Sequence, residues 1–293
     1  MSMMLFHLSM VYHMVLGFLG CTLRKIGYFD SAKPDIRILN FHDIPPNKYK
    51  KFVRQIERIG QKRRFINVSE FESVMNGERD LTESVVLLTF DDGFQSNFVI
   101  AKEILNPRDI KALFFVVPDF VDTSHENERI QFIEQRFFPG KKLGSEKKTL
   151  RAMSWAEINQ LIVDGHTIGS HTGSHAKLSD IIDNEQLYRE IVSSGDTIAQ
   201  NTGSLVEHFA ITFGNTNSMS KEALAIAGRR YRYVYSAVRG YNNSGTNRLA
   251  IRRETIDPCD SLIFTSGALD GIADFQYERE RKALDLLAIK ATF

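Results

Sequence analysis

The chain has 293 residues, of which 43% are hydrophobic and 25% are charged, and its formal net charge is +1. These values are ordinary for a globular enzyme with one principal domain, large enough to form a barrel. Because 37 basic residues are balanced by 36 acidic ones, no broad electrostatic field favours nucleic acid or an anionic surface as a partner. We therefore expect no nucleic-acid partner and a neutral substrate.

The two cysteines argue against two kinds of cysteine-based structure. Only Cys21 and Cys259 occur, far apart and without C-x-x-C spacing. This pattern predicts neither a disulfide framework nor a cysteine metal site.

Residues 3–22 form the most apolar stretch of the chain. They contain His7 and His13 and lack a preceding basic region, so they do not fit a secretory signal. Their length is near the minimum for a membrane span, so they could form a single helical anchor. The alternative, which we favour, is an amphipathic or buried helix attached to the main domain. We therefore divide the chain into an apolar helical extension, residues 1–35, and a main domain, residues 36–293. We expect a cytoplasmic location, with membrane association through this extension left open.

The main domain opens with a strand-helix pattern. Residues 36–41 (IRILNF) predict a buried strand that ends before His42 and the Pro45-Pro46 turn. Residues 49–59 predict an amphipathic helix, and residues 69–72 begin another short one.

A second buried strand delivers two adjacent acids. Residues 85–90 (VVLLTF) lead directly into Asp91, Asp92 and Gly93. Adjacent residues of an extended chain point in opposite directions, so the two carboxylates should have different roles. This stretch alone fits a simple Asp-Gly turn equally well.

The next segments continue the alternation of helix and strand. Residues 94–105 predict a helix that stops at Asn106-Pro107, and residues 111–117 predict a strand. Such alternation favours parallel strands with helices outside, and functional residues then collect at the C-terminal strand ends. Residues 119–152 interrupt it with a charged insertion, either a functional lid or a mobile surface excursion. We interpret it as a rim that shapes access for the substrate.

Two histidines follow the next predicted strand. Ser154 and Glu157 predict the start of a helix to about Val163, and residues 166–169 predict a strand. The segment after it places His171 and His175 four residues apart, and neutral imidazoles are preferred ligands of zinc and similar ions. Such a pair alone is more often structural than metal-binding.

The remaining elements complete the pattern. We expect helices at residues 185–201, ended by Gly203, and at residues 220–229. We expect strands at residues 207–214, 233–238 and 248–256, and a charged terminal helix after Gly271.

Two motifs together resemble a known family. Thr89–Gly93 matches TFDDG, and His171–His175 matches H-[ST]-x-x-H, of the NodB-homology polysaccharide deacetylases, carbohydrate esterase family four. The resemblance covers residues 36–272. It implies an α/β fold, a distorted (β/α) barrel of about seven strands, and a metal-dependent hydrolase that removes N-acetyl groups from a sugar of a polysaccharide or glycan precursor.

The resemblance also implies residue roles. Asp91 would be the catalytic base, and Asp92, His171 and His175 would hold a divalent metal ion, for which we expect zinc. Phe41-His42 stands where many relatives have a Tyr-His pair.

The third motif of the family matches less completely. Thr212 stands where Pro is usual, while Phe213 and Gly214 keep the pattern. The resemblance gives the backbone N–H of Phe213 a role in holding the oxyanion. The arginine that some members carry there is absent, and so is the later histidine motif that supplies a general acid. We therefore expect His42 to protonate the leaving group.

We expect a carbohydrate deacetylase of bacterial surface-polysaccharide biosynthesis. One alternative is an O-acetyl esterase on carbohydrate, because an ester needs less protonation of its leaving group. Another is a catalytically silent sugar-binding barrel, against which the four intact motif residues argue. The sequence leaves the exact sugar, the metal and the oligomeric state open.

Overall fold

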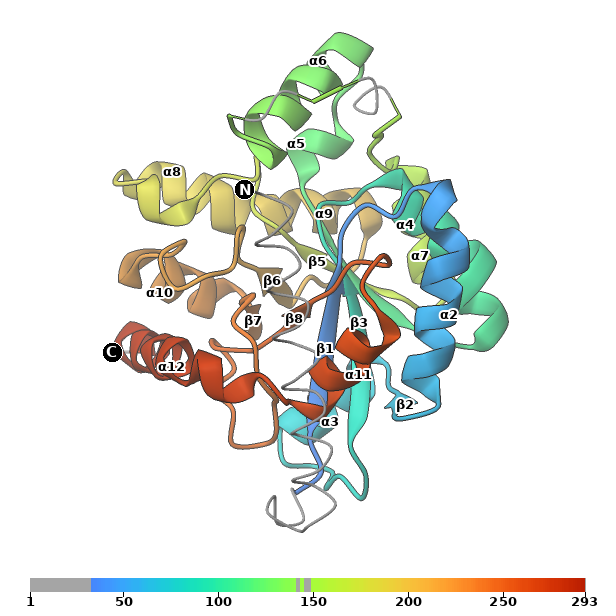
Figure 1. The fold of residues 1–293 in the computed structure, drawn as a ribbon. Coiled ribbons are helices and arrows are strands. Elements are labelled where there is room, and N and C mark those ends of the chain that lie inside the picture. The colour runs from blue at the N-terminus through green and yellow to red at the C-terminus, as the bar shows by residue number, and fades with distance from the viewer. Residues whose placement is uncertain (1–32, 141–142, 145–148, 293) are drawn as a thin grey trace, which may run out of the picture.

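A computed structural model describes residues 33–140, 143–144 and 149–292 and shows a curled parallel sheet surrounded by helices (Figure 1). Eight strands form one sheet in the order β7-β6-β5-β4-β3-β1-β8, with β2 beside β3 off this path. A bridge between Tyr235 and Ile251 links the two ends of the sheet. The expected distorted barrel of about seven strands is confirmed. The strands are β1 (Ile36–Phe41), β2 (Arg64–Phe65), β3 (Val85–Phe90), β4 (Ala112–Val116), β5 (Thr167–Ser170), β6 (His208–Ala210), β7 (Tyr233–Tyr235) and β8 (Glu254–Thr255).

The parallel register aligns the ends of the central strands. Phe41 of β1 is opposite Phe90 of β3, and Val116 of β4 is opposite Ser170 of β5. Because parallel strands end at a common edge, the residues that follow them lie together there. The register therefore gathers the segments that carry His42, Asp91 and His171.

Two hydrophobic cores fill the two sides of the sheet. Along β3, Val85 and Leu87 belong to the core inside the curled sheet, whereas Val86, Leu88 and Phe90 belong to the core beneath the helices. This alternation explains why the strand is apolar throughout. Asp91 continues the inward series, so its carboxylate points to the mouth of the barrel.

Helices cover the outside of the sheet (Figure 1). The helix α2 buries Phe52 against Phe41, with ring centroids 5.1 Å apart, and thereby closes the outer core over β1. The α-helices are α2 (Tyr49–Gly60), α3 (Val68–Met75), α4 (Gln95–Ile100), α5 (Pro118–Val121), α6 (Glu126–Phe132), α7 (Trp155–Val163), α8 (Asn184–Tyr188), α9 (Ser194–Thr202), α10 (Lys221–Arg230), α11 (Leu262–Asp270) and α12 (Glu278–Thr292).

The helix boundaries largely follow the sequence signals. Ser154 and Glu157 form the expected capping box of α7, and Gly203, at φ 65°, ends α9 in the left-handed conformation. The expected helices at residues 94–105 and 185–201 each contain a π-helical turn, Ala101–Leu105 and Arg189–Ser193.

Four predictions of secondary structure needed correction, those of the three late strands and that of the insertion. The late strands are shorter than expected, because the chain leaves the sheet after Ala210, after Tyr235 and on both sides of Glu254–Thr255. The insertion at residues 119–152 is not a simple loop, because it contains α6 and the π-helical turn Ile133–Phe137. Sequence periodicity missed these helices because their apolar face is made mainly of aromatic residues that contact one another.

The N-terminal extension lies almost wholly outside the described residues, which begin at Lys33. Within the part of the chain that the structure describes, no helix is long and apolar enough to cross a membrane.

Gly169 of β5 provides a test of the packing beneath the histidine motif. A Cβ at this position would lie 2.6 Å from the Phe115 ring and 2.9 Å from the carbonyl oxygen of His208. We expect Gly169→Ala to lower the free energy of unfolding by about 1–3 kcal/mol through overpacking, measured by urea denaturation. Gly267→Ala in α11 is the control, because its Cβ would meet nothing closer than 3.6 Å. Equal stability of the two variants would contradict this account of β5.

Candidate active site and metal centre

Asp92, His171 and His175 converge at the C-terminal edge of the sheet. Oδ1 of Asp92 lies 3.6 Å from Nε2 of His171 and 3.4 Å from Nε2 of His175. All three residues are buried, and their ligand atoms lie within 4.8 Å of one another. The structure therefore brings together the three residues that the motifs predict as metal ligands.

The environment of Asp92 fits a bound cation. Its Oδ1 is buried and accepts no hydrogen bond from any of the described residues. Leaving a buried acceptor unpaired costs about 1–3 kcal/mol, and more when it is charged. A divalent cation with oxygen and imidazole ligands would remove this cost.

The histidines are oriented as metal ligands usually are. Nδ1 of His171 lies 2.8 Å from the carbonyl oxygen of Ala210, and Nδ1 of His175 lies 3.0 Å from that of Arg136. Since a carbonyl only accepts hydrogen bonds, each Nδ1 donates, and each Nε2 keeps its lone pair for a metal. Burial lowers the pKa of His171 to about 4, so this imidazole is neutral at pH 7.

Backbone strain concentrates at the site. Among the described residues, five other than glycine have positive φ, and four of them are Asp92, Thr172, His175 and Phe213. Such conformations cost about 1–3 kcal/mol each and persist only where their surroundings hold them. We infer that these backbone conformations are kept because they position the side chains of the site, although they lower the local stability.

Glu190 holds the loop that carries both histidines. Its carboxylate accepts hydrogen bonds from the backbone N–H of Ser174 at 2.9 Å and from the Ser174 hydroxyl at 2.7 Å. Its carbonyl oxygen accepts from Gly173 N–H at 3.0 Å. These contacts fix the chain between His171 and His175.

The insertion contributes directly to the candidate metal centre. Besides the Arg136 carbonyl, it supplies Phe137, whose ring packs edge-on against His175 with centroids 4.8 Å apart. Phe137 is itself packed by other rings of the aromatic cluster, which are Phe94, Phe120 and Phe132. The insertion therefore orients a predicted ligand, a role that sequence analysis did not foresee.

Asp91 has a different set of partners. Arg253 binds its carboxylate with two hydrogen bonds, of 2.7 Å and 2.9 Å, and Asn40 donates a third at 2.9 Å. Burial raises the pKa of Asp91, but the charge and hydrogen bonds of Arg253 outweigh burial and hold that pKa well below its usual range. Asp91 is therefore a fixed, ionised carboxylate, whereas its neighbour Asp92 faces the histidines.

Sequence analysis missed Asn40 and Arg253. Asn40 is the one polar uncharged residue in the apolar run of β1, and Arg253 lies in a segment predicted to be the last strand. Buried polar side chains require internal partners, so both positions carried a signal. Nothing in their spacing indicated that the partner is Asp91, because Asn40 is 51 residues and Arg253 is 162 residues away from it in the chain.

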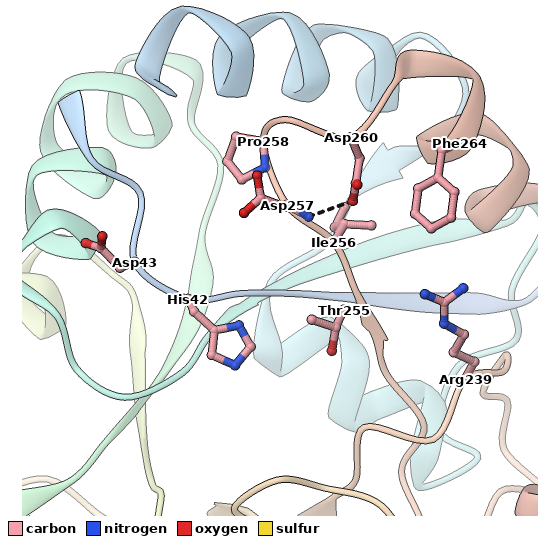
Figure 2. Close-up of a pocket in the computed structure, with 9 residues that line it drawn as sticks. All are labelled: His42, Asp43, Arg239, Thr255, Ile256, Asp257, Pro258, Asp260 and Phe264. Atoms are coloured by element: carbon pink, nitrogen blue, oxygen red, sulfur yellow. Dashed lines mark hydrogen bonds between the residues drawn. The ribbon is translucent and has the colours of Figure 1, made fainter. Parts of the chain in front are cut away.

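His42 lies at the same edge but is exposed to solvent. The backbone N–H of Asp91 donates to the carbonyl oxygen of Phe41 at 2.9 Å, so His42 directly follows a residue that contacts Asp91. It also lines a cavity beside the site (Figure 2).

Phe213 reaches the site from the other side. Its ring packs against His175 with centroids 5.0 Å apart and is 41% exposed. Within the described residues its backbone N–H donates no hydrogen bond. Thr212, which stands where relatives have Pro, donates its hydroxyl to the Ala176 carbonyl at 2.5 Å and so ties this loop to the histidine loop.

Comparison with known families identifies the class of protein. A family model described as "Polysaccharide deacetylase" matches residues 78–232, more than half of the chain. The chain belongs to the polysaccharide deacetylase family, as the two motifs predict. No curated protein sequence matches it.

Several solved structures have the same fold. IcaB from Ammonifex degensii is 21% identical, with a TM-score of 0.62, over 80% of this chain and 97% of that one. The deacetylase PplD of Streptococcus pyogenes, in complex with acetate, is 18% identical, with a TM-score of 0.62, over 81% and 99%. A de-N-acetylase from Aggregatibacter actinomycetemcomitans is 16% identical, with a TM-score of 0.60, over 77% and 96%. At these identities the likeness establishes the fold.

The buried pair of Arg253 and Asp91 leads to a prediction about stability. Removing one partner of a buried ion pair leaves an uncompensated charge and costs about 3–5 kcal/mol. We expect Arg253→Met to lower the free energy of unfolding by this amount in urea denaturation. The neighbouring Arg252→Met is the control, because Arg252 pairs with the half-exposed Asp285 and should cost about 1 kcal/mol or less. Similar losses in the two variants would refute the special role of Arg253.

Proposed function

We propose that the chain is a metal-dependent hydrolase that removes N-acetyl groups from a sugar of a polysaccharide or glycan precursor, with zinc as the preferred ion. The proposal rests on one observation, which is that a candidate base and a set of candidate metal ligands lie together at one edge of the sheet. An ionised carboxylate, Asp91, stands beside three convergent ligands, Asp92, His171 and His175. The de-N-acetylase among the structural relatives supports the N-acetyl group as the target. The bacterial sources of those relatives support a role in bacterial surface-polysaccharide biosynthesis.

Asp92, His171 and His175 would hold the metal ion. When bound, a divalent ion polarises a carbonyl and lowers the pKa of a coordinated water toward about 7. The residues around the ligands keep their donor atoms free of competing protons, since the carbonyls of Ala210 and Arg136 take up both Nδ1–H groups. The ligand set is thus prepared before an ion arrives.

Asp91 would accept the proton from the attacking water. A carboxylate offers about four acceptor positions, and Arg253 and Asn40 occupy three of them. The position left over can receive a proton while the same hydrogen bonds fix the carboxylate in place. This fixation matters because a base must stay within hydrogen-bonding distance of the water.

The Phe213 backbone would stabilise the oxyanion. No described residue accepts a hydrogen bond from its N–H, and its ring position against His175 places this loop beside the ligands. A preorganised donor of this kind is typically worth about 3 kcal/mol in the transition state.

His42 would protonate the departing amine. It is exposed, lines the cavity beside the site and directly follows Phe41, whose carbonyl oxygen accepts a hydrogen bond from Asp91 N–H. Histidine is the side chain that ordinarily both gains and loses a proton between about pH 5 and 8, which suits a general acid.

The proposal predicts a separation between metal binding and turnover. Acetate release from N-acetylated oligosaccharides should stop when a chelator removes the metal and return when zinc is added. Asp91→Asn should keep one ion per chain by atomic emission and lose at least about 10²-fold in turnover. Asp92→Asn should lose the ion, because it removes the charged ligand. Loss of the ion from both variants alike would show that Asp91 is needed to bind the ion and would contradict its separate role as the base. Full activity without any ion would refute metal dependence.

The proposed acid leads to a second prediction. An amine leaves poorly without protonation, whereas the leaving group of an activated ester does not need it. We expect His42→Ala to lower the rate of N-deacetylation by about 10²-fold and the hydrolysis of 4-nitrophenyl acetate by less than about tenfold. Equal losses on both substrates would instead assign His42 a structural role. No loss on either would remove it from the mechanism.

A further inference from the structure

A groove of about 610 Å³ lies between α2 and α11, which are next to each other on the outside of the molecule (Figure 1). Arg58 Nε donates to Ser266 Oγ at 3.1 Å, and Lys62 Nζ lies 2.6 Å from Oδ2 of Asp270. Each of these contacts joins residues that are 208 positions apart in the chain, so the two helices run parallel in a constant register. The same register places Arg54 beside Leu262 at the other end of the groove, which both residues line.

The helix α11 is unusually apolar for a helix at the surface. Its sequence, LIFTSGALD, has no charged residue before Asp270. Thr265 and Leu269 are buried, but Leu262 and Ile263 are 42% and 61% exposed. A surface helix normally carries charged or polar residues on its outer face, and a helix that is apolar all round is normally covered. The outer face of α11 is thus of the kind that another surface covers.

Gly267 lies in the middle of α11 and lines the groove. Glycine weakens a helix relative to alanine. A Cβ on Gly267 would meet nothing closer than the Ile272 side chain, at 3.6 Å, and the backbone there does not have a positive φ. No contact within the described residues therefore explains a glycine at this position. With Ser266 beside it, it leaves a low place where the backbone of a second helix can approach.

The charged residues around the groove make this surface complementary to itself. Arg54 is exposed and forms no ion pair with any described residue, whereas the opposite end of the groove carries the carboxylate of Asp270. In the register of the two helices, each end is four residues, or about one helical turn, from Ser266. A two-fold axis near Ser266 would therefore set two copies of α11 antiparallel and bring Arg54 of each chain to Asp270 of the other.

The overall charge of the groove also favours a second copy of the chain over a strongly acidic partner. The basic residues that line it are Arg54, Arg58 and Lys62, and the acidic ones are Glu57 and Asp270. Because these charges nearly balance, two copies of the surface do not repel each other, and an anionic surface gains little.

We propose that the groove between α2 and α11 is the interface of a two-fold symmetric dimer of this chain. In such a dimer one surface patch serves both chains, which is the commonest arrangement among soluble oligomers. The α11 helices would cross at Ser266 and Gly267, and Ile263 of each chain would lie against Ile272 of the other. The segment that carries Asp257 and Asp260 leads directly into α11, so the interface would also support one wall of the cavity beside the candidate active site (Figure 2).

The test measures the mass of the full chain by light scattering after size-exclusion chromatography, from about 1 µM to about 100 µM, where a dimer with a micromolar Kd dissociates. The wild-type mass should approach twice that of one chain. Ile263→Asp places a carboxylate in the apolar seam, and Gly267→Leu blocks the approach of the helices, so each should raise the dimer Kd by at least about 100-fold. Ile289→Asp is the matched control, because Ile289 is 51% exposed on α12, outside the groove, and it should leave the Kd unchanged.

A pair of charge reversals tests the antiparallel arrangement. Arg54→Asp and Asp270→Arg each place like charges together at both ends of the seam, so each variant alone should dimerise at least about tenfold more weakly than wild type. An equimolar mixture of the two variants should recover the dimer, because every contact then joins a carboxylate to a guanidinium. Melting curves by circular dichroism check that each variant is folded. A residue that only supported the fold of its own chain would show no such recovery.

The contrary outcomes are equally specific. A wild-type chain that is monomeric at about 100 µM, or a dimer that Ile263→Asp and Gly267→Leu leave intact, would overturn the proposal. A mixture of the charge variants that stays as weak as its components would overturn the two-fold arrangement.

Two other occupants of the groove would be recognised in a monomeric chain. Binding to phosphatidylcholine vesicles with about 30% phosphatidylglycerol, lost in Ile263→Asp, would assign the groove to a membrane surface. Protection of an Ile263→Cys thiol from maleimide, located by mass spectrometry, would assign it to residues 1–32 of the same chain. Either result would replace the dimer, and none of these measurements depends on the proposed deacetylase activity.

Discussion

The bidentate ion pair between Arg253 and Asp91 is the interaction on which the site depends. It joins the segment of the last strand to the end of β3 across the mouth of the barrel, and Asn40 of β1 adds a third connection. An ionised carboxylate at this depth is tolerated because a guanidinium matches both of its oxygens. With Asp91 committed to this side, Asp92 takes a left-handed backbone conformation, at φ 74°, and turns to the histidines. The same ion pair thus joins two strand ends and makes the carboxylates of Asp91 and Asp92 face different partners.

The candidate metal centre depends in turn on loops that do not belong to the regular barrel. Glu190 fixes the histidine loop, and the Arg136 carbonyl and Phe137 ring orient His175. The strands determine where the histidines emerge, whereas these loop contacts determine which way the rings face. A 1 Å displacement of a reacting group can cost a large factor in rate, so residues outside the two motifs share in the function.

The sequence predicted the family, the barrel and the positions of its central strands along the chain, because buried runs such as residues 85–90 and cap signals such as Ser154 are local. It also selected the residues that converge, since the two motifs carry them in a recognisable spacing. It could not pair Arg253 with Asp91 or Glu190 with Ser174, because such contacts depend on how separate segments of the folded chain meet. The roles of Asp91, His42 and Phe213 stay predictions. The helices of the insertion were missed because its aromatic residues are buried against one another rather than along a regular stripe.

The hydrogen bond from His175 to the Arg136 carbonyl links the folding of the insertion to ion binding. Any local opening that withdraws this carbonyl frees the imidazole to rotate and weakens its hold on a cation. By thermodynamic linkage, the factor by which opening weakens ion binding is also the factor by which a bound ion suppresses opening. Residues 126–138 would then respond to the metal as a unit, and their amide hydrogens would exchange with solvent more slowly when the ion is present. Hydrogen exchange in the insertion would in this way show whether an ion is bound at the candidate metal centre.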